Sequence, residues 1–241
     1  MQNIRKLIAG NWKMNGARSA IDNFVTAING HNTVHDVLIC PPFPYIGAFT
    51  GAKFDIGAQD CSSQPEGAFT GEVSAKMLAD IGCSHVIIGH SERRQYHGEE
   101  GLLLRQKLLQ GKEAGLKLIH CVGETLAERE AGEAKDIVEG QIIAEMPDNL
   151  SAESYIVAYE PVWAIGTGKV ASTQDIAEMH LHIHNILQSR LDNPAAIRIL
   201  YGGSVKPENA KEIGAVPHVG GFLVGGASLK GESFLSIIQS C

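Results

Sequence analysis

The stretch Tyr155-Ile-Val-Ala-Tyr-Glu-Pro-Val-Trp-Ala-Ile-Gly-Thr-Gly-Lys169 joins an apolar run to a single carboxylate and a loop bounded by proline and glycines. Ile156–Tyr159 is short, β-branched and aromatic, without polar alternation, which is typical of a strand covered on both faces. Pro161 cannot donate a ladder hydrogen bond and therefore ends the strand. Glu160 is then a carboxylate at a strand end, beside a loop that can close over it. The alternative reading is an ordinary ion pair on a surface loop.

Seven further short apolar runs occur along the chain, and longer amphipathic stretches separate most of them. These runs are Leu7–Asn11, Val37–Cys40, Ile56–Ala58, His85–Ile88, Leu116–Cys121, Ile197–Tyr201 and Phe222–Val224. The clearest helical pattern follows Thr173, where apolar residues recur three or four apart and Ser172 supplies an N-cap. The unit that begins at Pro41 is the weakest, because its helix would be short and would start in a proline-rich turn.

Strands that alternate with helices pair in parallel, because a crossover between parallel neighbours needs about a dozen residues or more. Eight such units in 241 residues predict a closed (βα)8 barrel of the TIM-barrel type, a single domain over residues 1–241. The main alternative is an open doubly wound sheet. No Gly-x-Gly-x-x-Gly pattern follows the first strand, and no linker-like change of composition divides the chain, so the barrel is favoured.

Composition restricts the function classes. With 44% hydrophobic and 20% charged residues, the chain is an ordinary globular protein rather than a disordered one. A net charge of -7 argues against a nucleic-acid partner or an anionic membrane surface, so an anionic ligand would need a local positive pocket. The five cysteines are scattered without a CxxC pair, which suits reduced thiols. No apolar run reaches a membrane-spanning length, and residues 1–9 do not form a signal peptide, so we expect a cytoplasmic protein.

Chemistry-bearing side chains follow several of the predicted strands. Asn11 and Lys13 come at the end of the first strand, His90 and Glu92 after the fourth, and Glu160 after the sixth. Because active sites of these barrels lie where the strands end, we expect the five side chains on one rim. A single histidine or lysine in such a place is more often structural, and only the convergence favours function.

Glycine pairs follow the last two strands, in Gly202-Gly-Ser204 and in Gly225-Gly226. Without Cβ atoms, backbone N–H groups can approach an anion closely, and the seventh and eighth loops of such barrels commonly bind phosphate. One Gly-Gly pair alone is usually a tight turn. Two pairs on adjacent strands predict a phosphate site.

Histidines invite two further interpretations. His90 precedes a probable helix start at Ser91, and the helix dipole there would disfavour imidazolium and keep the ring neutral. His180, His182 and His184 resemble a metal cluster, but a two-residue spacing places His182 on another part of the helix, and no carboxylate triad accompanies them. We therefore favour no metal site.

Five motifs together carry a family resemblance. They are Asn11-Trp-Lys13-Met-Asn, His90-Ser-Glu-Arg-Arg94, Tyr159-Glu-Pro-Val-Trp-Ala-Ile-Gly-Thr-Gly168, Tyr201-Gly-Gly-Ser-Val205 and Gly221-Phe-Leu-Val-Gly-Gly-Ala-Ser-Leu229. In this order they resemble the triosephosphate isomerase family, from residue 3 to about residue 238. The resemblance implies interconversion of dihydroxyacetone phosphate and D-glyceraldehyde 3-phosphate through an enediol(ate), in glycolysis and gluconeogenesis. It implies no cofactor.

The resemblance also assigns roles to the matching positions. Glu160 would be the base that moves a proton between C1 and C2, and His90 the neutral electrophile that polarises the carbonyl. Lys13 and Asn11 would bind substrate and complement the developing oxyanion, and Glu92 would support the pocket.

For the phosphate group, the family pattern assigns the backbone amides of Gly166, Ser204, Gly225 and Gly226. A flap from Pro161 to Gly168 would close above them. Closure would exclude water and hold the phosphate in the plane of the enediolate, which opposes its elimination.

The family is usually a homodimer, and the loop Cys61–Gly71 resembles its protruding third loop, with Thr70 expected to reach the neighbour's pocket. Ala68 and Phe69 on this long loop independently indicate a buried contact. The alternative is an ordinary surface loop. The chain departs from the family pattern at Gly220, where Asp is frequent, and near His184, where Arg is frequent, and we expect consequences for local stability more than for chemistry.

Two other functions fit part of the pattern. A phosphosugar aldolase could use Lys13 as a Schiff-base amine. A non-catalytic phosphosugar sensor could retain the anion site alone, although Glu160 and His90 would then have no purpose. Each reading takes a small phosphorylated sugar as the partner, with neither nucleic acid nor membrane.

Overall fold

The computed structural model describes residues 5–49, 51–165 and 170–241, and in it eight parallel strands close into a barrel in sequence order. The strands are β1 (Leu7–Asn11), β2 (Asp36–Cys40), β3 (Asp55–Ala58), β4 (His85–Ile88), β5 (Lys117–Val122), β6 (Tyr155–Tyr159), β7 (Ile199–Tyr201) and β8 (Gly221–Val224). Every predicted strand is confirmed, with ends that differ by at most two residues. The last pairing, β8 with β1, closes the sheet and leaves no free edge.

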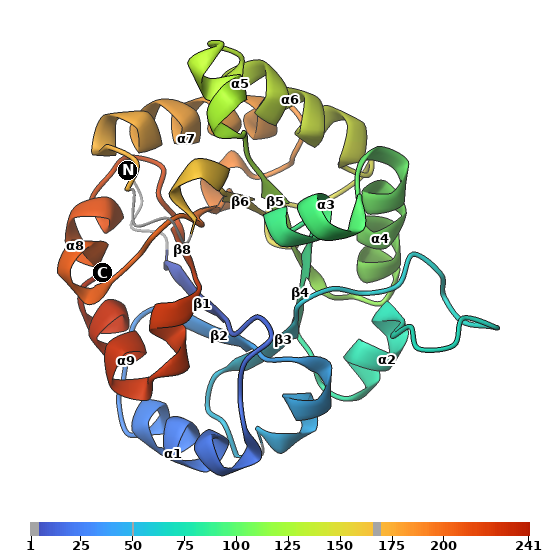
Figure 1. Cartoon of the computed structure of the whole chain (residues 1–241), viewed down its shortest axis with the longest axis vertical. Helices are drawn as coiled ribbons and strands as arrows, with labels where there is room; N and C mark the ends of the chain where they lie inside the picture. Colours follow the sequence, from blue (N-terminus) through green and yellow to red (C-terminus); the bar gives the residue numbers. More distant parts are fainter. Residues whose placement is uncertain (1–4, 50, 166–169) are drawn as a thin grey trace.

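Helices surround the barrel as an outer ring (Figure 1). The α-helices are α1 (Arg18–Asn29), α2 (Ala75–Asp80), α3 (Ser91–His97), α4 (Gly101–Glu113), α5 (Leu126–Glu130), α6 (Ala134–Glu145), α7 (Thr173–Gln188), α8 (Pro207–Gly214) and α9 (Gly231–Gln239). Short 3₁₀ turns are η1 (Phe43–Ala48), η2 (Val162–Ala164), η3 (Pro194–Ala196) and η4 (Gly226–Leu229). The expected N-cap at Ser172 is a complete capping box with Asp175, and the weak second unit is the short turn η1.

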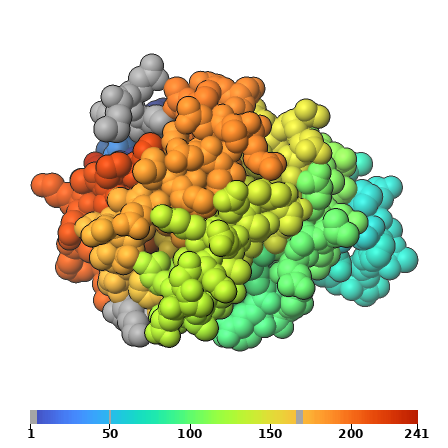
Figure 2. Space-filling view, turned by 90° about the horizontal axis from the view of Figure 1, so that it is seen from above, coloured from blue at the N-terminus to red at the C-terminus, as the bar shows by residue number. Residues whose placement is uncertain are grey.

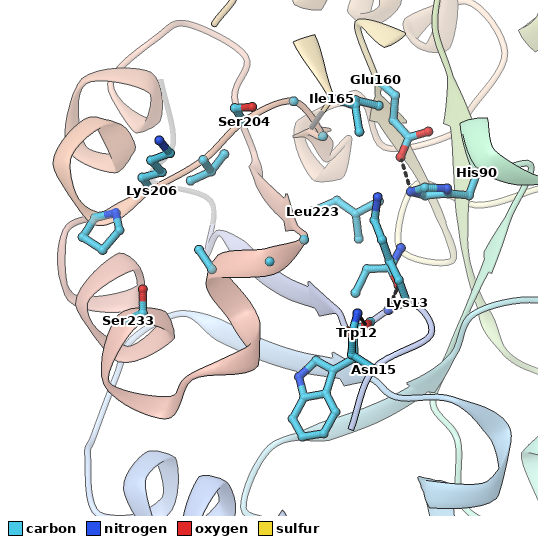
Figure 3. A pocket seen from close by; sticks show the side chains of 18 of the residues that line it. Trp12, Lys13, Asn15, His90, Glu160, Ile165, Ser204, Lys206, Leu223 and Ser233 are labelled. Atoms are coloured by element: carbon cyan, nitrogen blue, oxygen red, sulfur yellow. Dashed lines mark hydrogen bonds and ion pairs between the residues drawn. The ribbon is translucent and has the colours of Figure 1, made fainter. Parts of the chain in front are cut away.

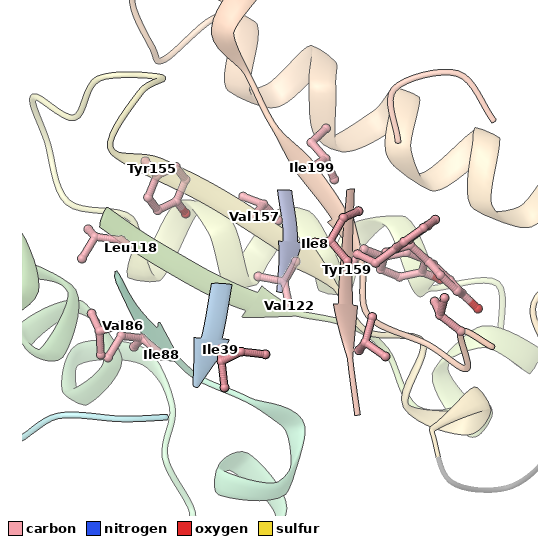
Figure 4. Close-up of a cluster of buried hydrophobic side chains, with 14 of the residues drawn as sticks. Ile8, Ile39, Val86, Ile88, Leu118, Val122, Tyr155, Val157, Tyr159 and Ile199 are labelled. Atoms are coloured by element: carbon pink, nitrogen blue, oxygen red, sulfur yellow. The ribbon is translucent and has the colours of Figure 1, made fainter. Parts of the chain in front are cut away.

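The strands bury both faces, which explains their unbroken apolar sequences. Side chains on one face meet inside the barrel, and they are Leu7, Ala9, Leu38, Cys40, Ile87, Ile119, Cys121, Ile156, Ala158, Leu200 and Leu223. Alternate residues such as Ile8, Val157 and Ile199 pack outward with the helices in a larger cluster (Figure 4). Because successive side chains of a strand alternate, one strand sequence serves both layers. Because the side chains on both faces are packed, the strands are held in place, and so are the polar residues at their carboxyl ends.

The loop 61–71 projects beyond the ring of helices, as the cyan segment in Figure 1 and the cyan knob in Figure 2 show. Ser62 closes its base, because the Ser62 N–H donates to the Val73 carbonyl at 2.8 Å and the hydroxyl bonds the Glu72 carboxylate. Phe69 stands near the tip with 45% of its surface exposed.

All five cysteines are free thiols. None of the helices in the described ranges has the length and apolarity that crossing a membrane requires.

The three histidines of α7 lie in different surroundings. His180 is buried, with Nδ1 3.2 Å from the His218 carbonyl oxygen. His182 Nε2 lies 3.2 Å from the Lys135 carbonyl oxygen, and the His184 ring packs on His218 with centroids 4.3 Å apart. Within residues 5–49, 51–165 and 170–241, no group of three or more His, Cys, Asp or Glu side chains could hold a metal ion. Near His184, where the family pattern often has Arg, the chain therefore has a pair of partly buried imidazoles, His184 and His218.

Two buried histidines make the fold sensitive to acid. Burial lowers the pKa of His180 to about 4 and that of His85 to about 3, from an ordinary value of 6.5. Below pH 6.5 the unfolded chain therefore takes up protons that the folded chain does not bind. Stability is full above pH 6.5 and falls as the pH drops, by about 1.4 kcal/mol per pH unit for each such group.

We expect the free energy of unfolding to be lower at about pH 5 than at about pH 7, as urea denaturation at a fixed protein concentration would show. His180→Asn should weaken this pH dependence, because one differential proton uptake is lost. His31→Gln, at an exposed histidine, should leave it unchanged. Equal stability of the wild-type chain at the two pH values would contradict the buried neutral state.

Candidate active site

Glu160 lies at the carboxyl end of β6, and its side chain is 2% exposed. Its backbone N–H donates to the Val122 carbonyl at 2.8 Å, so the residue is still tied to β5. A Cβ added at Gly123 would lie 1.8 Å from the Glu160 carbonyl oxygen, and one at Gly202 would lie 2.9 Å from Glu160 Cγ. Two glycines on the neighbouring strands therefore give Glu160 its space. Gly123 escaped the sequence analysis, since a lone glycine after a strand looks like any turn.

His90 and Ser91 hold the Glu160 carboxylate at the start of α3. The His90 Nε2 atom is 3.1 Å from Glu160 Oε1, and the Ser91 backbone N–H donates to Oε2 at 2.8 Å (Figure 3). His90 is the N-cap of α3, and its Nδ1 accepts the Glu92 N–H at 3.2 Å. A nitrogen that accepts a backbone N–H carries no proton, so the ring proton lies on Nε2 and faces the carboxylate. The geometry agrees with a neutral imidazole that can donate one hydrogen bond into the site.

Lys13 extends toward the same space from the end of β1 (Figure 3). Its ammonium contacts Glu92 at 2.6 Å. The Lys13 backbone has a φ of 51°, a costly conformation for a residue other than glycine. The Asn11 side chain accepts the Lys13 N–H at 3.0 Å, and Gln59 Nε2 donates to the Lys13 carbonyl at 2.9 Å. A strained backbone that two neighbouring amide side chains fix is a sign of function, and the sequence analysis did not foresee Gln59.

A cavity of about 560 Å³ collects these groups at the barrel rim. Of the predicted site residues, those that line it are Asn11, Lys13, His90, Glu160, Ser204, Gly225 and Gly226. Glu92 reaches the site through Lys13, and Gly166 lies outside the described residues. Lys206 also lines the cavity and adds a second positive side chain that the sequence analysis did not single out. The charged side chains of this lining balance, since Lys13 and Lys206 are matched by Glu160 and Glu208. The positive pocket expected for an anionic ligand is thus not formed by the lining side chains alone, which leaves backbone N–H groups as further donors.

Ser204 and the Gly225–Gly226 pair line the same cavity as His90 and Glu160, and Figure 3 draws Ser204 near Ile165. Gly225 is the N-cap of η4, so this turn begins at the cavity with backbone N–H groups that lack intrahelical partners. Its carbonyl accepts both the N–H and the hydroxyl of Ser228, at 2.8 and 2.7 Å, which fixes the turn. The Ser204 hydroxyl donates to the Ala164 carbonyl at 2.8 Å, so this loop also contacts the flap.

The described part of the flap begins as the turn η2, anchored by a buried carboxylate on the neighbouring strand. Glu124 Oε1 accepts hydrogen bonds from Trp163 Nε1 at 2.8 Å and from the Tyr159 hydroxyl at 3.1 Å. Arg129 lies 3.3 Å from the same oxygen and stacks over the Trp163 ring at 4.9 Å. The flap therefore has a fixed first half, whereas 166–169, which include the rest of the predicted flap, lie outside the described residues.

Taken together, the cavity presents a desolvated carboxylate, a hydrogen-bonding imidazole and an ammonium group, together with glycine-bearing loops. A carboxylate that is free of water and close to a donor can remove a proton from carbon. The donors beside it can take the charge that such a step creates on oxygen. The arrangement suits proton transfer on a small molecule with an anionic tail.

Comparisons with known proteins agree with this chemistry. The family model described as triosephosphate isomerase matches residues 6–241. A triosephosphate isomerase of Bradyrhizobium diazoefficiens is 49% identical over 246 residues, which cover 99% of this chain and 98% of that protein. One of Rhodopseudomonas palustris is 49% identical over 248 residues, with 99% and 98% covered. The crystal structure of triosephosphate isomerase from Bartonella henselae superposes with a TM-score of 0.89 and 42% identity, over 98% of this chain and 99% of that one.

The close approach of Gly123 to Glu160 leads to a stability test. Gly123→Ala should lower the free energy of unfolding by about 3 kcal/mol, the upper end for an overpacked site, because the Cβ and the Glu160 carbonyl cannot share the space. Urea denaturation measures the change. Gly140→Ala on α6 is the control, because a Cβ there meets nothing within 4 Å and alanine favours a helix. Equal stability of the Gly123→Ala variant and the wild type would disprove the tight packing.

Proposed function

The chain belongs to the triosephosphate isomerase family, and on that basis we propose that Glu160, His90, Lys13, Asn11 and Glu92 carry its reaction. The enzyme interconverts dihydroxyacetone phosphate and D-glyceraldehyde 3-phosphate, a step of glycolysis. The observation that supports the residue assignment is the meeting of Glu160, His90 and Lys13 at one cavity, with Glu160 Oε1 3.1 Å from His90 Nε2.

The first half of the proposed mechanism removes a proton from carbon. The Glu160 carboxylate takes a proton from C1 of dihydroxyacetone phosphate, and the C–H electron pair forms the C1–C2 double bond. The carbonyl electrons move onto the C2 oxygen, which takes a proton from His90 Nε2. To face the carbon, Glu160 gives up the hydrogen bond from the Ser91 N–H, so the substrate replaces one protein contact of the base.

The second half returns the proton to the neighbouring carbon. The C1 hydroxyl gives its proton to the His90 ring and becomes the aldehyde oxygen, while protonated Glu160 delivers its proton to C2. The substrate and product have the same atoms, and both protein groups end as they began. Throughout, the Lys13 ammonium lies near the developing negative charge, with its backbone fixed by Asn11 and its side chain by Glu92.

The phosphate group is proposed to bind the backbone amides of Ser204, Gly225 and Gly226, with Gly166 from the flap as a further donor. Support comes from the place of the first three in the lining of the cavity that Glu160 also lines. Main-chain donors hold a dianion without adding a mobile charge, so the tail can be gripped far from the reacting carbons. This grip positions C1 and C2 against Glu160.

The contact between Lys13 and Glu92 favours this role for the lysine over a Schiff base. An aldolase lysine must attack as a neutral amine, whereas a carboxylate 2.6 Å away stabilises the charged ammonium. We therefore assign Lys13 to charge complementation.

Shortening the base should separate chemistry from binding. Glu160→Asp withdraws the carboxylate by one methylene, and a misplacement of about 1 Å can cost on the order of a hundredfold in rate. We expect kcat to fall by about that factor, while KM and the inhibition constant of inorganic phosphate stay within about twofold. A coupled assay for glyceraldehyde 3-phosphate measures both constants.

The matched control is Glu212→Asp, which shortens an exposed carboxylate on α8 that does not line the cavity and should leave kcat unchanged. Near-normal turnover of the Glu160→Asp variant would disprove the assigned role of Glu160.

We also propose that two chains associate through the loop 61–71, with Thr70 reaching the neighbour's pocket. Support comes from apolar side chains that the single chain leaves exposed, namely Phe69 at 45% on this loop, Met14 at 95% and Tyr96 at 71%. The turn Gly67–Phe69 gives the loop a defined shape, because the Phe69 N–H donates to the Gly67 carbonyl at 2.9 Å.

The free state of the cysteines supports a cytoplasmic location.

Charge at the loop tip should break this association. Phe69→Asp should convert the proposed dimer to monomer in sedimentation at micromolar concentration, because an aspartate cannot be buried there without a partner. Leu181→Asp on α7 is the control, since Leu181 is also about half exposed, at 47%, and α7 lies away from the loop in Figure 1. A wild-type sample that sediments only as monomer would contradict the proposal.

A further inference from the structure

We propose that Glu145, on the outer helix α6 and outside the substrate cavity, is a positioning residue that acts on Glu160 and His90 through Arg94. Glu145 has no predicted role in the sequence analysis, and it lies among the residues behind the rim rather than among those that line the substrate cavity. The inference rests on the roles proposed above for Glu160 and His90.

Arg94 ties the ends of two strands to the first turn of α3. Its Nε donates to the Gly89 carbonyl at 2.9 Å, and its Nη2 donates to the Cys121 carbonyl at 2.9 Å. Gly89 immediately precedes His90, and Cys121 lies in β5 beside the strand that ends in Glu160. The Arg94 backbone N–H donates in turn to the His90 carbonyl at 3.2 Å. The guanidinium therefore links the residue before the proposed electrophile to the strand beside the proposed base.

Glu145 fixes the guanidinium from behind. Its Oε1 accepts Arg94 Nη1 at 2.7 Å and its Oε2 accepts Nη2 at 2.6 Å, a two-pronged pairing that sets the orientation of both planar groups. The Gly101 N–H at the start of α4 adds a hydrogen bond to Oε1 at 3.2 Å. The Glu145 side chain is 3% exposed, so water does not compete for these contacts. One carboxylate thus joins α3, α4 and α6 at a single point.

His120 and Tyr155 complete the set and fix the carboxylate itself. His120 Nε2 lies 2.7 Å from Glu145 Oε2, and His120 Nδ1 lies 2.6 Å from the Tyr155 hydroxyl. Because a carboxylate only accepts, the ring donates from Nε2, and Nδ1 is left to accept from tyrosine. Burial raises the pKa of Glu145, but hydrogen bonds from Arg94 and His120 and the positive charge of Arg94 outweigh it and lower the pKa to about 2. The carboxylate is therefore charged over the working pH range.

The connection to the reaction runs through the start of α3. The Ser91 N–H holds Glu160 Oε2 at 2.8 Å, and His90 caps the same helix. A small tilt of α3 would displace His90 and, through Ser91, the position from which Glu160 moves onto the substrate, and a displacement of about 1 Å is enough to cost a large factor in rate. Apolar side chains could fill the same volume without loss of stability, so a buried ion pair here points to the fixing of geometry.

The test compares Glu145→Gln with Glu139→Gln, which removes an exposed carboxylate from the same helix. Glu139 contacts only His182 among the salt bridges of the described residues and does not touch Arg94. For Glu145→Gln we expect kcat to fall by about tenfold or more, with KM and the inhibition constant of inorganic phosphate within about twofold of wild type. Glu139→Gln should match the wild type in all three, and Glu145→Asp, which keeps the charge, should recover part of kcat.

A second variant covers the case in which Glu145→Gln fails to fold because it leaves a buried cation unpaired. Arg94→Met with Glu145→Met removes both charges, so no uncompensated ion remains. It should fold and still show the reduced kcat with an unchanged phosphate inhibition constant. A folded Glu145→Gln or double variant with wild-type kcat would overturn the inference. So would a parallel loss of phosphate binding, which would mean that the substitution damages the whole barrel.

The Glu160→Asp variant distinguishes a failure of this inference from a failure of the proposed role of Glu160 as the base. Normal turnover of Glu160→Asp would remove the proposed base, and with it the group that Glu145 is inferred to position. Reduced turnover of Glu160→Asp, together with normal turnover of Glu145→Gln, would leave the base in place and reject only the positioning role.

Discussion

The hold of the first turn of α3 on the Glu160 carboxylate is the interaction on which this site depends. One oxygen faces the His90 ring and the other accepts the Ser91 N–H, so both proposed proton-transfer groups share one helix start. The closed parallel barrel makes this possible, because it brings the ends of β4 and β6 to one rim although their sequences are some seventy residues apart. The start of α3 is therefore the place where the barrel brings the two proposed catalytic groups together.

Electrostatics is arranged in layers around this contact. The cavity of this acidic chain is lined by two lysines, Lys13 and Lys206, and by two glutamates, Glu160 and Glu208, so in the proposed function backbone donors bind the anionic tail. Behind the rim, Arg94 and Glu145 form a neutral pair that holds the strand ends without projecting charge into the cavity. His90, His120 and His180 are all buried, but only His90 of these three lines the substrate cavity.

Much of this could be predicted from the sequence. The eight strands could be recognised in the sequence because each is covered on both faces and is therefore an unbroken apolar run. Residues that follow several of these strands line the cavity because parallel strands end at the same rim. The network of Glu145, His120 and Tyr155 was out of reach, since its members lie far apart in sequence and each resembles a normal helix or strand residue. The tight packing at Gly123 is likewise a property of two strands in register. Long-range side-chain geometry, rather than local pattern, marks the limit.

The central claim is that the reaction proceeds by proton transfer to and from a protein carboxylate, and turnover in heavy water tests it most directly. A proton held by Glu160 can exchange with solvent before it returns to carbon, whereas a hydride that moves from C1 to C2 cannot. Dihydroxyacetone phosphate converted in D₂O should therefore give glyceraldehyde 3-phosphate with deuterium at C2, detectable by NMR or mass spectrometry. Product that carries no deuterium at C2 would contradict the account.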